Sequence, residues 1–278
     1  MLVMKCASKA GCVPEIGLGT FGIGGDFWRR DNSRDFEAVK ALRRGFELGL
    51  RLVDTSELYG EGHAEELIKI ASSGIEELLV ITKIHPSSLE PGEVYKRLLG
   101  STERLGRRPW MVMLHWVPVG YHICDVVKAL ESAVAKGLAD NFGLSNVTAS
   151  QVSAALTCTK RMEPVAIENK YSLRYRRDEL DVIPLAQREG LLYLGYSPLE
   201  RGALALDSFL ASIGRKYNKS AVQVALNWYV KIPNVVPIVK ASSASHVEEI
   251  AQSIGWALSE EDWKLIDKQF YIYRFQQY

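Results

Sequence analysis

Residues 50–83 read LRLVDTSELYGEGHAEELIKIASSGIEELLVITK, and this stretch decides the fold. A short apolar run at 52–54 is followed by polar residues, an amphipathic stretch over 64–72, and a second apolar run over 78–82. Two short apolar runs joined by a helical pattern are typical of a βαβ unit, in which a helix connects two parallel strands. The stretch therefore predicts the beginning of a parallel sheet with helices packed on it.

The same alternation extends over almost the whole chain. Eight apolar runs predict strands at 17–20, 52–54, 78–82, 110–114, 139–144, 165–168, 191–196 and 235–238. Apolar residues at three- and four-residue spacing predict helices over 35–50, 64–72, 91–105, 125–136, 149–157 and 178–189. Eight such repeats close into a barrel, so we expect an α/β fold of the (β/α)8 TIM-barrel type.

Several segments fall outside these repeats. Extra helices are predicted over 208–217 and 220–230, and a last helix begins after Ser259, a serine N-cap followed by three acids. The first dozen residues predict a hairpin around residues 9–11 that closes the bottom of the barrel. Because no linker or low-complexity tract interrupts the chain, we expect a single domain over residues 1–278.

Bulk composition restricts the class of protein. Among 278 residues, 47% are hydrophobic and 24% charged, and the formal net charge is +1. This balance is typical of a globular protein with a sizeable core, and it gives no electrostatic reason to expect nucleic acid as a partner. No apolar run is long enough to span a membrane and the beginning does not resemble a signal peptide, so we expect a cytoplasmic location. The four cysteines have no metal-ligand spacing. Cys6 and Cys12 could meet across the N-terminal hairpin, but a chain with a sizeable core does not need a disulfide, so we expect reduced thiols.

Four polar residues follow predicted strands at one end of the barrel. Asp54 ends the second strand and Tyr59 lies in the loop after it, Lys83 follows the third strand, and His115 follows the fourth. In a parallel barrel, functional side chains gather at the carboxyl ends of the strands. We therefore expect these four side chains to converge on one rim.

These four residues have the chemistry that reduction of a carbonyl group requires. The reaction needs a hydride at carbon and a proton at the developing alkoxide. Tyr59 is a weak acid, so we expect the Lys83 ammonium to lower its pKa toward the working range, while Asp54 pairs with Lys83. His115 would hydrogen-bond the carbonyl oxygen and orient it.

Each residue alone has a structural explanation. Aspartate at a strand end is more often a helix cap or an ion-pair partner, and a single tyrosine, lysine or histidine there usually packs or snorkels. The interpretation depends on all four falling at strand ends of one barrel. A metal-dependent hydrolase that uses His63, His85 or His115 is an alternative, but the sequence lacks an HxH pair, and we expect no metal.

The segment from Gly49 through Asp54-Thr55 to Tyr59-Gly60 resembles the most characteristic segment of the aldo-keto reductases. The resemblance continues in family order over essentially the whole chain, through residues 82–83, 113–116, 143–146 and 196–199. It implies an oxidoreductase that uses NADPH, with NADH possible, to reduce small-molecule carbonyl compounds. It also implies that Asp54, Tyr59, Lys83 and His115 are the catalytic residues, with Tyr59 as the general acid.

The resemblance further implies a set of cofactor-binding residues along the barrel mouth, which are Gly19, Thr20, Ser145, Asn146, Glu168, Tyr196, Ser197, Leu199, Gly202, Lys240, Ser242, His246 and Glu249. Ser145 and Asn146 would bind the carboxamide of the nicotinamide, and Tyr196 would stack on its ring. Three positions depart from the family pattern: Glu168 stands where glutamine is common, His246 where arginine is usual, and Ile250 where asparagine is usual. The last two weaken the expected preference for NADPH over NADH.

The loops leave more open. Phe27, Trp28, His85 and Trp116 are candidates for the wall of a substrate pocket, although each could equally be loop packing. The aromatic tail 269–278 is expected to fold over the barrel or to contact another subunit, and the chain to be a monomer or a small homo-oligomer. Because the same fold also serves as a cofactor-sensing partner of ion channels, a non-catalytic regulatory subunit is the main alternative; retention of all four catalytic residues favours an enzyme.

Overall fold

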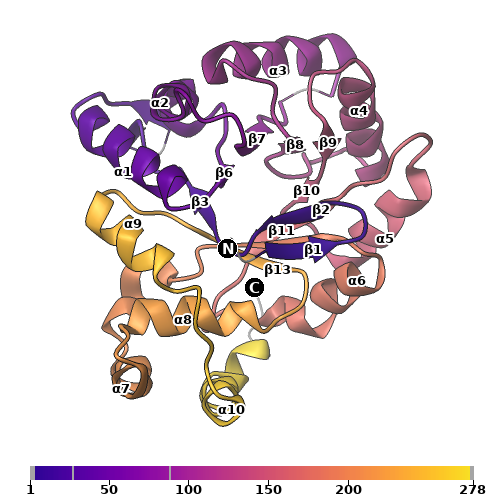
Figure 1. Cartoon of the computed structure of the whole chain (residues 1–278). Helices are drawn as coiled ribbons and strands as arrows, with labels where there is room; N and C mark the ends of the chain where they lie inside the picture. The colour runs from indigo at the N-terminus through magenta and orange to yellow at the C-terminus, as the bar shows by residue number, and fades with distance from the viewer. Residues whose placement is uncertain (1–3, 27, 88, 276–278) are drawn as a thin grey trace.

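A computed structural model describes residues 4–26, 28–87 and 89–275 and contains the expected parallel barrel (Figure 1). Its sheet has the strand order β10-β11-β12-β13-β3-β6-β7-β8-β9. The strands are β3 (Gly17–Gly19), β6 (Leu52–Asp54), β7 (Leu79–Ile84), β8 (Met111–Leu114), β9 (Asn141–Phe142), β10 (Leu144–Ser145), β11 (Ala166–Lys170), β12 (Leu192–Tyr196) and β13 (Val235–Val239). All the strand pairs of this sheet are parallel, as predicted.

The predicted fifth strand closes the barrel, although it is divided in two. β9 pairs with β8 and β10 pairs with β11, and only Gly143 separates β9 from β10. A Cβ atom at Gly143 would lie 2.5 Å from Met113 Cε and 2.9 Å from the carbonyl oxygen of Ala166. Glycine is therefore required where the chain passes closely between its neighbours.

Helices surround the sheet in the order expected from the sequence (Figure 1). They are α1 (Asp35–Glu47), α2 (His63–Ala71), α3 (Pro91–Leu105), α4 (Ile123–Ala135), α5 (Ala149–Cys158), α6 (Val182–Arg188), α7 (Ser208–Tyr217), α8 (Ala221–Val230), α9 (Ala244–Ala251) and α10 (Glu260–Gln269). Short 3-10 segments are η1 (Tyr59–Gly62), η2 (Arg177–Leu180), η3 (Glu200–Leu206) and η4 (Tyr271–Arg274).

One predicted helix is interrupted in the structure. The segment 178–189 is divided into η2 and α6, because Asp181 has an extended φ of −149° and its side chain accepts a hydrogen bond from Val182 N at 2.7 Å. An aspartate that binds the next backbone N–H starts a new helix rather than continuing the old one. The cap Ser259 of α10 is confirmed, since its side chain accepts from Asp262 N.

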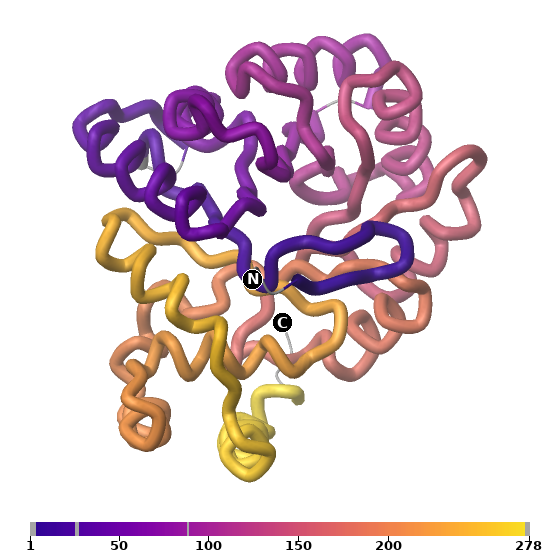
Figure 2. Tube along the Cα trace, in the orientation of Figure 1, coloured from indigo at the N-terminus to yellow at the C-terminus, as the bar shows by residue number. Residues whose placement is uncertain are grey.

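The N-terminal hairpin is present, with β1 (Met4–Ala7) paired antiparallel to β2 (Gly11–Pro14). Val13 is fully buried in the cluster that fills the barrel, together with Leu52 and Ile81 from the strands. Figure 2 shows the hairpin lying across one end of the barrel. It covers the amino-terminal end and leaves the carboxyl ends of the strands for the site. A second hairpin, β4 (Gly25–Asp26) with β5 (Arg29–Arg30), was not predicted.

The expectation of reduced thiols is wrong. Cys6 and Cys12 occupy directly opposite positions in the hairpin register and form a disulfide. Cys124 on α4 forms a second disulfide with Cys158 at the end of α5. The sequence had offered Cys6 and Cys12 as an alternative pair across the hairpin, whereas the second pair depends on the packing of consecutive helices and left no signal in the spacing.

The tail packs back on its own chain as far as the structure describes it. Buried Arg176 donates to Glu179 at 2.6 Å, lies beside Asp267, and has its guanidinium 4.8 Å from the Trp228 ring centroid. Arg274 of η4 also donates to Asp267, at 3.0 Å. These contacts fix η4 against η2. Among the described residues, no helix combines the length and apolar composition needed to cross a bilayer.

Candidate active site

The four predicted catalytic residues lie together at the carboxyl ends of neighbouring strands. Asp54 ends β6, Lys83 lies near the end of β7, His115 follows β8 directly, and Tyr59 begins η1 in the loop after β6. Asp54 is paired in register with Ile81 of β7, and Lys83 with Met113 of β8. The parallel register brings these side chains, which are distant in sequence, to one rim of the barrel.

A buried charge cluster forms the base of this rim. The Lys83 ammonium pairs with Asp54 and lies 3.1 Å from Glu168 Oε1 on β11. Lys83, Glu168 and Asp54 are only 1%, 2% and 4% exposed. Burial by itself would lower the pKa of Lys83, but the two carboxyl groups outweigh burial and raise it, so Lys83 stays charged. The sequence predicted Asp54 as the partner of Lys83 and Glu168 as a cofactor-binding residue, but it did not predict that Glu168 faces Lys83.

Tyr59 and His115 lie above the cluster. The hydroxyl of Tyr59 is 3.5 Å from His115 Nε2, and Lys83 Nζ is 5.9 Å from the centroid of the Tyr59 ring. Burial raises the pKa of Tyr59 well above its ordinary value; Lys83 opposes this rise, while Asp54 and Glu168 add to it. The expectation that Lys83 brings the pKa of Tyr59 down to the working range is therefore wrong for this structure, because burial of the phenol outweighs the effect of Lys83 and the two carboxyl groups also oppose it. Tyr59 is a neutral phenol that keeps its proton.

His115 is also neutral. Burial, followed by the nearby charges of Lys83 and His85, lowers the pKa of His115 to about 3. Ser56, which the sequence analysis did not single out, lies with its Oγ 3.1 Å from His115 Nδ1. A neutral imidazole with Nδ1 occupied presents Nε2 toward Tyr59.

Three predicted cofactor residues form one hydrogen-bonded chain beside His115. The hydroxyl of Tyr196 donates to Asn146 Oδ1 at 2.9 Å, and Asn146 Nδ2 donates to the carbonyl oxygen of His115 at 2.8 Å and to Ser145 Oγ at 3.2 Å. Asn146 has a φ of 55°, which turns its side chain out of the end of β10. An amide, a hydroxyl and an aromatic ring at the ends of β10 and β12 suit a planar ligand that carries a carboxamide.

The segment after β12 has an unusual backbone. Ser197, Glu200, Arg201 and Gly202 all have positive φ, from 48° to 95°, and only one of them is glycine. Such conformations cost free energy in non-glycine residues and cluster at ligand sites, where successive backbone N–H groups can bind an anion. Two strands along the sheet from β12, Gly19 of β3 is paired with Asp54, and Thr20 Oγ1 donates to the carbonyl oxygen of Asp54 at 2.9 Å. These features fit a pyrophosphate-containing cofactor laid over the rim.

The expected phosphate site lies where β13 leads into α9. Ser243, rather than Ser242, caps α9 by accepting from His246 N, and Ser242 and His246 are exposed near it. Lys240 is exposed, yet partial desolvation lowers its pKa, and the charge of Arg34 lowers it further. Sequence reasoning missed Arg34, which precedes α1 and carries no motif. Glu249 lies farther along α9 and is half-buried.

Aromatic side chains border the mouth near Tyr59. Trp28 is 49% exposed, and its ring centroid lies 6.2 Å from that of Tyr59 and 6.0 Å from that of His115. The ring centroid of Trp116 lies 5.4 Å from that of His115 and 5.5 Å from that of His85. Three of the predicted wall residues therefore come together, and Phe27 lies outside the described residues. Phe21, 5.3 Å from Tyr59, was missed.

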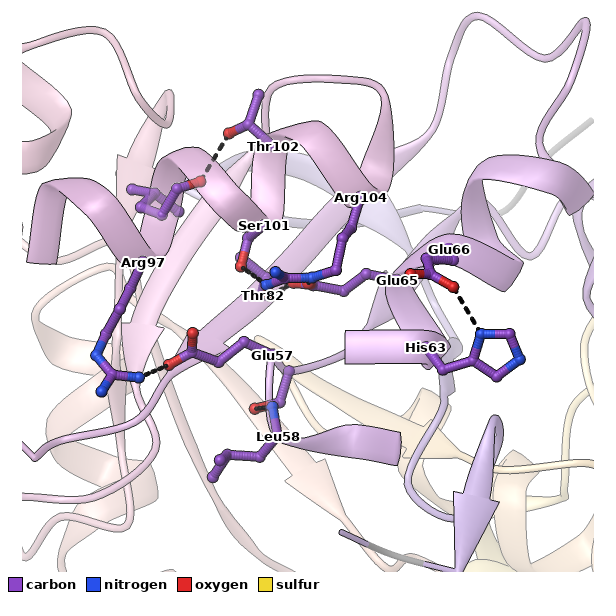
Figure 3. Close-up of polar contacts among 12 residues, drawn as sticks. Glu57, Leu58, His63, Glu65, Glu66, Thr82, Arg97, Ser101, Thr102 and Arg104 are labelled. Atoms are coloured by element: carbon purple, nitrogen blue, oxygen red, sulfur yellow. Dashed lines mark hydrogen bonds and ion pairs between the residues drawn. The ribbon is translucent and has the colours of Figure 1, made fainter. Parts of the chain in front are cut away.

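A second polar layer supports the loops around the site (Figure 3). Glu57 accepts from Arg97 Nη1 at 3.0 Å and from His85 N at 2.6 Å, which ties the loop after β6 to the loop after β7. Glu65 accepts from Thr82 Oγ1 at 2.6 Å and from Arg104 Nε at 2.7 Å behind β7.

Of the three histidines of the metal alternative, His63 lies in surroundings separate from those of His115. His63 contacts Glu66 at 2.8 Å and Asp35 at 2.9 Å, whereas His115 contacts Ser56 and Tyr59. Among the residues that the structure describes, no group of three or more histidine, cysteine or acidic side chains has the arrangement of a metal site.

Curated proteins with similar sequences include two enzymes of Escherichia coli (strain K12). The methylglyoxal reductase YeaE is 28% identical over 265 residues, covering 93% of this chain and 91% of its own length. Pyridoxine 4-dehydrogenase is 27% identical, with coverage of 83% and 85%.

Solved structures are similar over the whole fold. An aldo-keto reductase from Klebsiella pneumoniae in complex with NADPH has a TM-score of 0.89 at 27% identity and covers 100% of this chain and 98% of its own. A thermostable aldo-keto reductase in complex with the inhibitor epalrestat has a TM-score of 0.90 at 30% identity, with coverage of 96% and 99%. The profile of the Aldo/keto reductase family matches residues 15–269. With this match over a barrel whose rim carries Asp54, Tyr59, Lys83 and His115, the chain belongs to the aldo/keto reductase family.

Proposed function

We propose that this protein reduces aldehydes or ketones to alcohols, with a hydride from NADPH and a proton from Tyr59. The observation that carries the proposal is the neutral Tyr59 hydroxyl, 3.5 Å from neutral His115 and beside the Lys83–Asp54 pair, at the barrel mouth of an aldo/keto reductase. A proton donor, a group that orients oxygen and a buried cation are the parts that carbonyl reduction needs.

Bound NADPH supplies the hydride, which adds to the carbonyl carbon. Tyr59 and His115 would hold the carbonyl oxygen between them, and the Tyr59 O–H would deliver its proton to that oxygen as negative charge develops on it. The raised pKa of Tyr59 is compatible with this step, because an alkoxide is a stronger base than a phenolate. Lys83 would stabilise the phenolate that remains.

The residues at the mouth would hold the cofactor in the orientation that the reaction requires. Ser145 and Asn146 offer hydrogen bonds to a carboxamide, and Tyr196 offers an aromatic face. The segment 197–202 offers backbone N–H groups to the pyrophosphate. Lys240, with Arg34 nearby and the α9 N-terminus beside it, offers positive charge to a 2′-phosphate, which favours NADPH over NADH.

Small aldehydes and ketones are the substrate class that we favour. The walls near Tyr59 are aromatic and partly open, as Trp28 and Trp116 indicate, and a relative similar over most of the chain is a methylglyoxal reductase. A non-catalytic regulatory subunit is less well supported, because a regulator has no need of all four catalytic residues. A cytoplasmic location stays a prediction, and the two disulfides weigh against it, since disulfides persist mainly in oxidising compartments.

The test is titration of the purified protein with NADPH and with NADH, followed by fluorescence, and then a panel of aldehydes and ketones assayed by oxidation of NADPH. We expect tighter binding of NADPH and turnover of small aldehydes. Cofactor binding without turnover of any carbonyl compound would instead favour the regulatory alternative.

A further inference from the structure

The buried cluster at the base of the site contains one acid more than it has cations. Asp54 and Glu168 both face Lys83, and none of the three residues is more than 4% exposed. If both acids were ionised, the cluster would carry an uncompensated negative charge in a buried place, which is costly. One additional proton would make the cluster neutral.

Hydrogen bonding identifies where that proton belongs. Oε1 of Glu168 lies 3.1 Å from Nζ of Lys83. Oε2 is buried, and among the described residues no N–H or O–H group donates a hydrogen bond to it. The carboxyl groups of Glu168 and Asp54 are nevertheless within hydrogen-bonding reach of each other. Two carboxylates lack a hydrogen to share, whereas a carboxylic acid beside a carboxylate donates one.

We propose that Glu168 and Asp54 share one buried proton, held mainly on Glu168, and that this proton controls how strongly Lys83 acts on Tyr59. With Glu168 neutral, the ammonium of Lys83 balances only Asp54, and Tyr59 meets one carboxylate rather than two. With Glu168 ionised, the cluster gains a negative charge that disfavours the phenolate left by proton transfer. Glu168 is thus a positioning residue for charge in the reaction that we propose above, and this role depends on that function.

The surroundings of Glu168 support this assignment. Burial, followed by the charge of Asp54, raises the pKa of Glu168 from 4.5 to about 8, against the opposing effect of Lys83. Among the described residues, Lys83 also interacts with Tyr59, a neutral phenol, and with His115, a neutral imidazole, and Tyr196 acts on Tyr59 in turn. On the adjacent strands, the residues in register with Glu168 are Ser145 and Leu194, which carry no charge.

The proton is observable without substrate or cofactor. A protonated carboxyl group has an infrared C=O band that a carboxylate lacks. We would record infrared spectra of the protein and of Glu168→Gln from pH 6 to pH 10, and take their difference at each pH to isolate the band of Glu168. We expect a band that is lost with a midpoint near pH 8 and that is absent from Glu168→Gln. Asp54→Asn should also remove the band at pH 7, because without the charge of Asp54 the Lys83 ammonium would keep the Glu168 carboxyl group ionised. Absence of the band in the original protein below pH 7, or its persistence in Glu168→Gln, would overturn the proposal.

Kinetics and stability give two further readouts. Above pH 8 we expect kcat/KM to fall by up to about tenfold per pH unit. Glu168→Gln should lose this alkaline fall in kcat/KM, while Glu65→Gln, a control at another buried glutamate, should keep it.

Because the folded protein would hold a proton that the unfolded chain releases, thermal stability should decline as pH rises from about 4.5 to about 8. Glu168→Gln should flatten this decline. If no carbonyl compound is reduced, the infrared and thermal results still test the proton, so failure of the proposed function is distinguishable.

Discussion

Ser56 Oγ lies 3.1 Å from His115 Nδ1 and 2.9 Å from the carbonyl oxygen of Lys83, so one hydroxyl links the imidazole to the strand that carries the catalytic lysine. A serine hydroxyl has a single hydrogen. When it points to the Lys83 carbonyl, Nδ1 of His115 must carry the ring proton and Nε2 accepts from Tyr59. When it points to Nδ1, the ring proton lies on Nε2, which can then donate to a substrate oxygen. Ser56 therefore couples the tautomer of His115 to its own rotation.

Ser56→Ala removes this coupling. We expect kcat/KM to fall by roughly 3- to 10-fold, the size of one hydrogen bond between neutral groups, and the 15N chemical shifts of His115 to change. Ser101→Ala is the control, because Ser101 is also buried but contacts Arg104 on the outer layer (Figure 3). Unchanged nitrogen shifts in Ser56→Ala would show that the hydroxyl does not set the tautomer.

Tyr59→Phe tests the proton donor. The ring and its contact with Phe21 remain, while the hydroxyl that faces His115 is lost, so we expect carbonyl reduction to fall by at least about 100-fold. The dissociation constant for NADPH, measured by fluorescence, should change little. Tyr95→Phe, at a partly exposed tyrosine of α3, is the matched control. Loss of cofactor binding in Tyr59→Phe would contradict the assignment of Tyr59 as the acid.

Lys83→Met tests the electrostatic role of the ammonium. Lys83 lowers the pKa of both Tyr59 and Glu168, against burial, so its removal should raise both values. We expect the alkaline limb of the profile of kcat/KM against pH to move to higher pH, along with a large loss of rate. Circular dichroism would verify folding, since the variant leaves two buried acids without their cation. An alkaline limb at the same pH would reject the coupling.

The repeated βα pattern of the sequence was enough to predict the barrel and its four rim residues. Alternating apolar and amphipathic segments predicted the strands of the barrel, and the rule that function lies at the carboxyl ends of strands selected Asp54, Tyr59, Lys83 and His115. Asp54, Lys83 and His115 lie at or next to strand ends, and Tyr59 lies in the loop that follows β6, which is why a pattern in one dimension located them.

What the sequence missed depends on contacts across the barrel. Glu168 faces Lys83 from a strand that is far from β7 in the chain, and no spacing rule connects them. The raised pKa of Tyr59 follows from burial and from two carboxyl groups, whereas the motif drew attention only to the lysine. Ser56 and Arg34 stand beside recognised residues, but their partners become visible only in three dimensions.

Lys240→Ala tests cofactor preference at the beginning of α9. Partial desolvation, followed by the charge of nearby Arg34, lowers the pKa of Lys240, and two neighbouring cations favour an anion beside them. His246, where the family usually has arginine, lies exposed on the first turn of α9 and supplies less charge at neutral pH. We therefore expect Lys240→Ala to raise the dissociation constant for NADPH by roughly tenfold, about the free energy of one charge-assisted hydrogen bond, and that for NADH much less. Lys264→Ala, at an exposed lysine of α10, should change neither value. Equal losses for the two cofactors would mean that Lys240 meets a part of the cofactor that both share, and that the 2′-phosphate is bound by Arg34 or not at all.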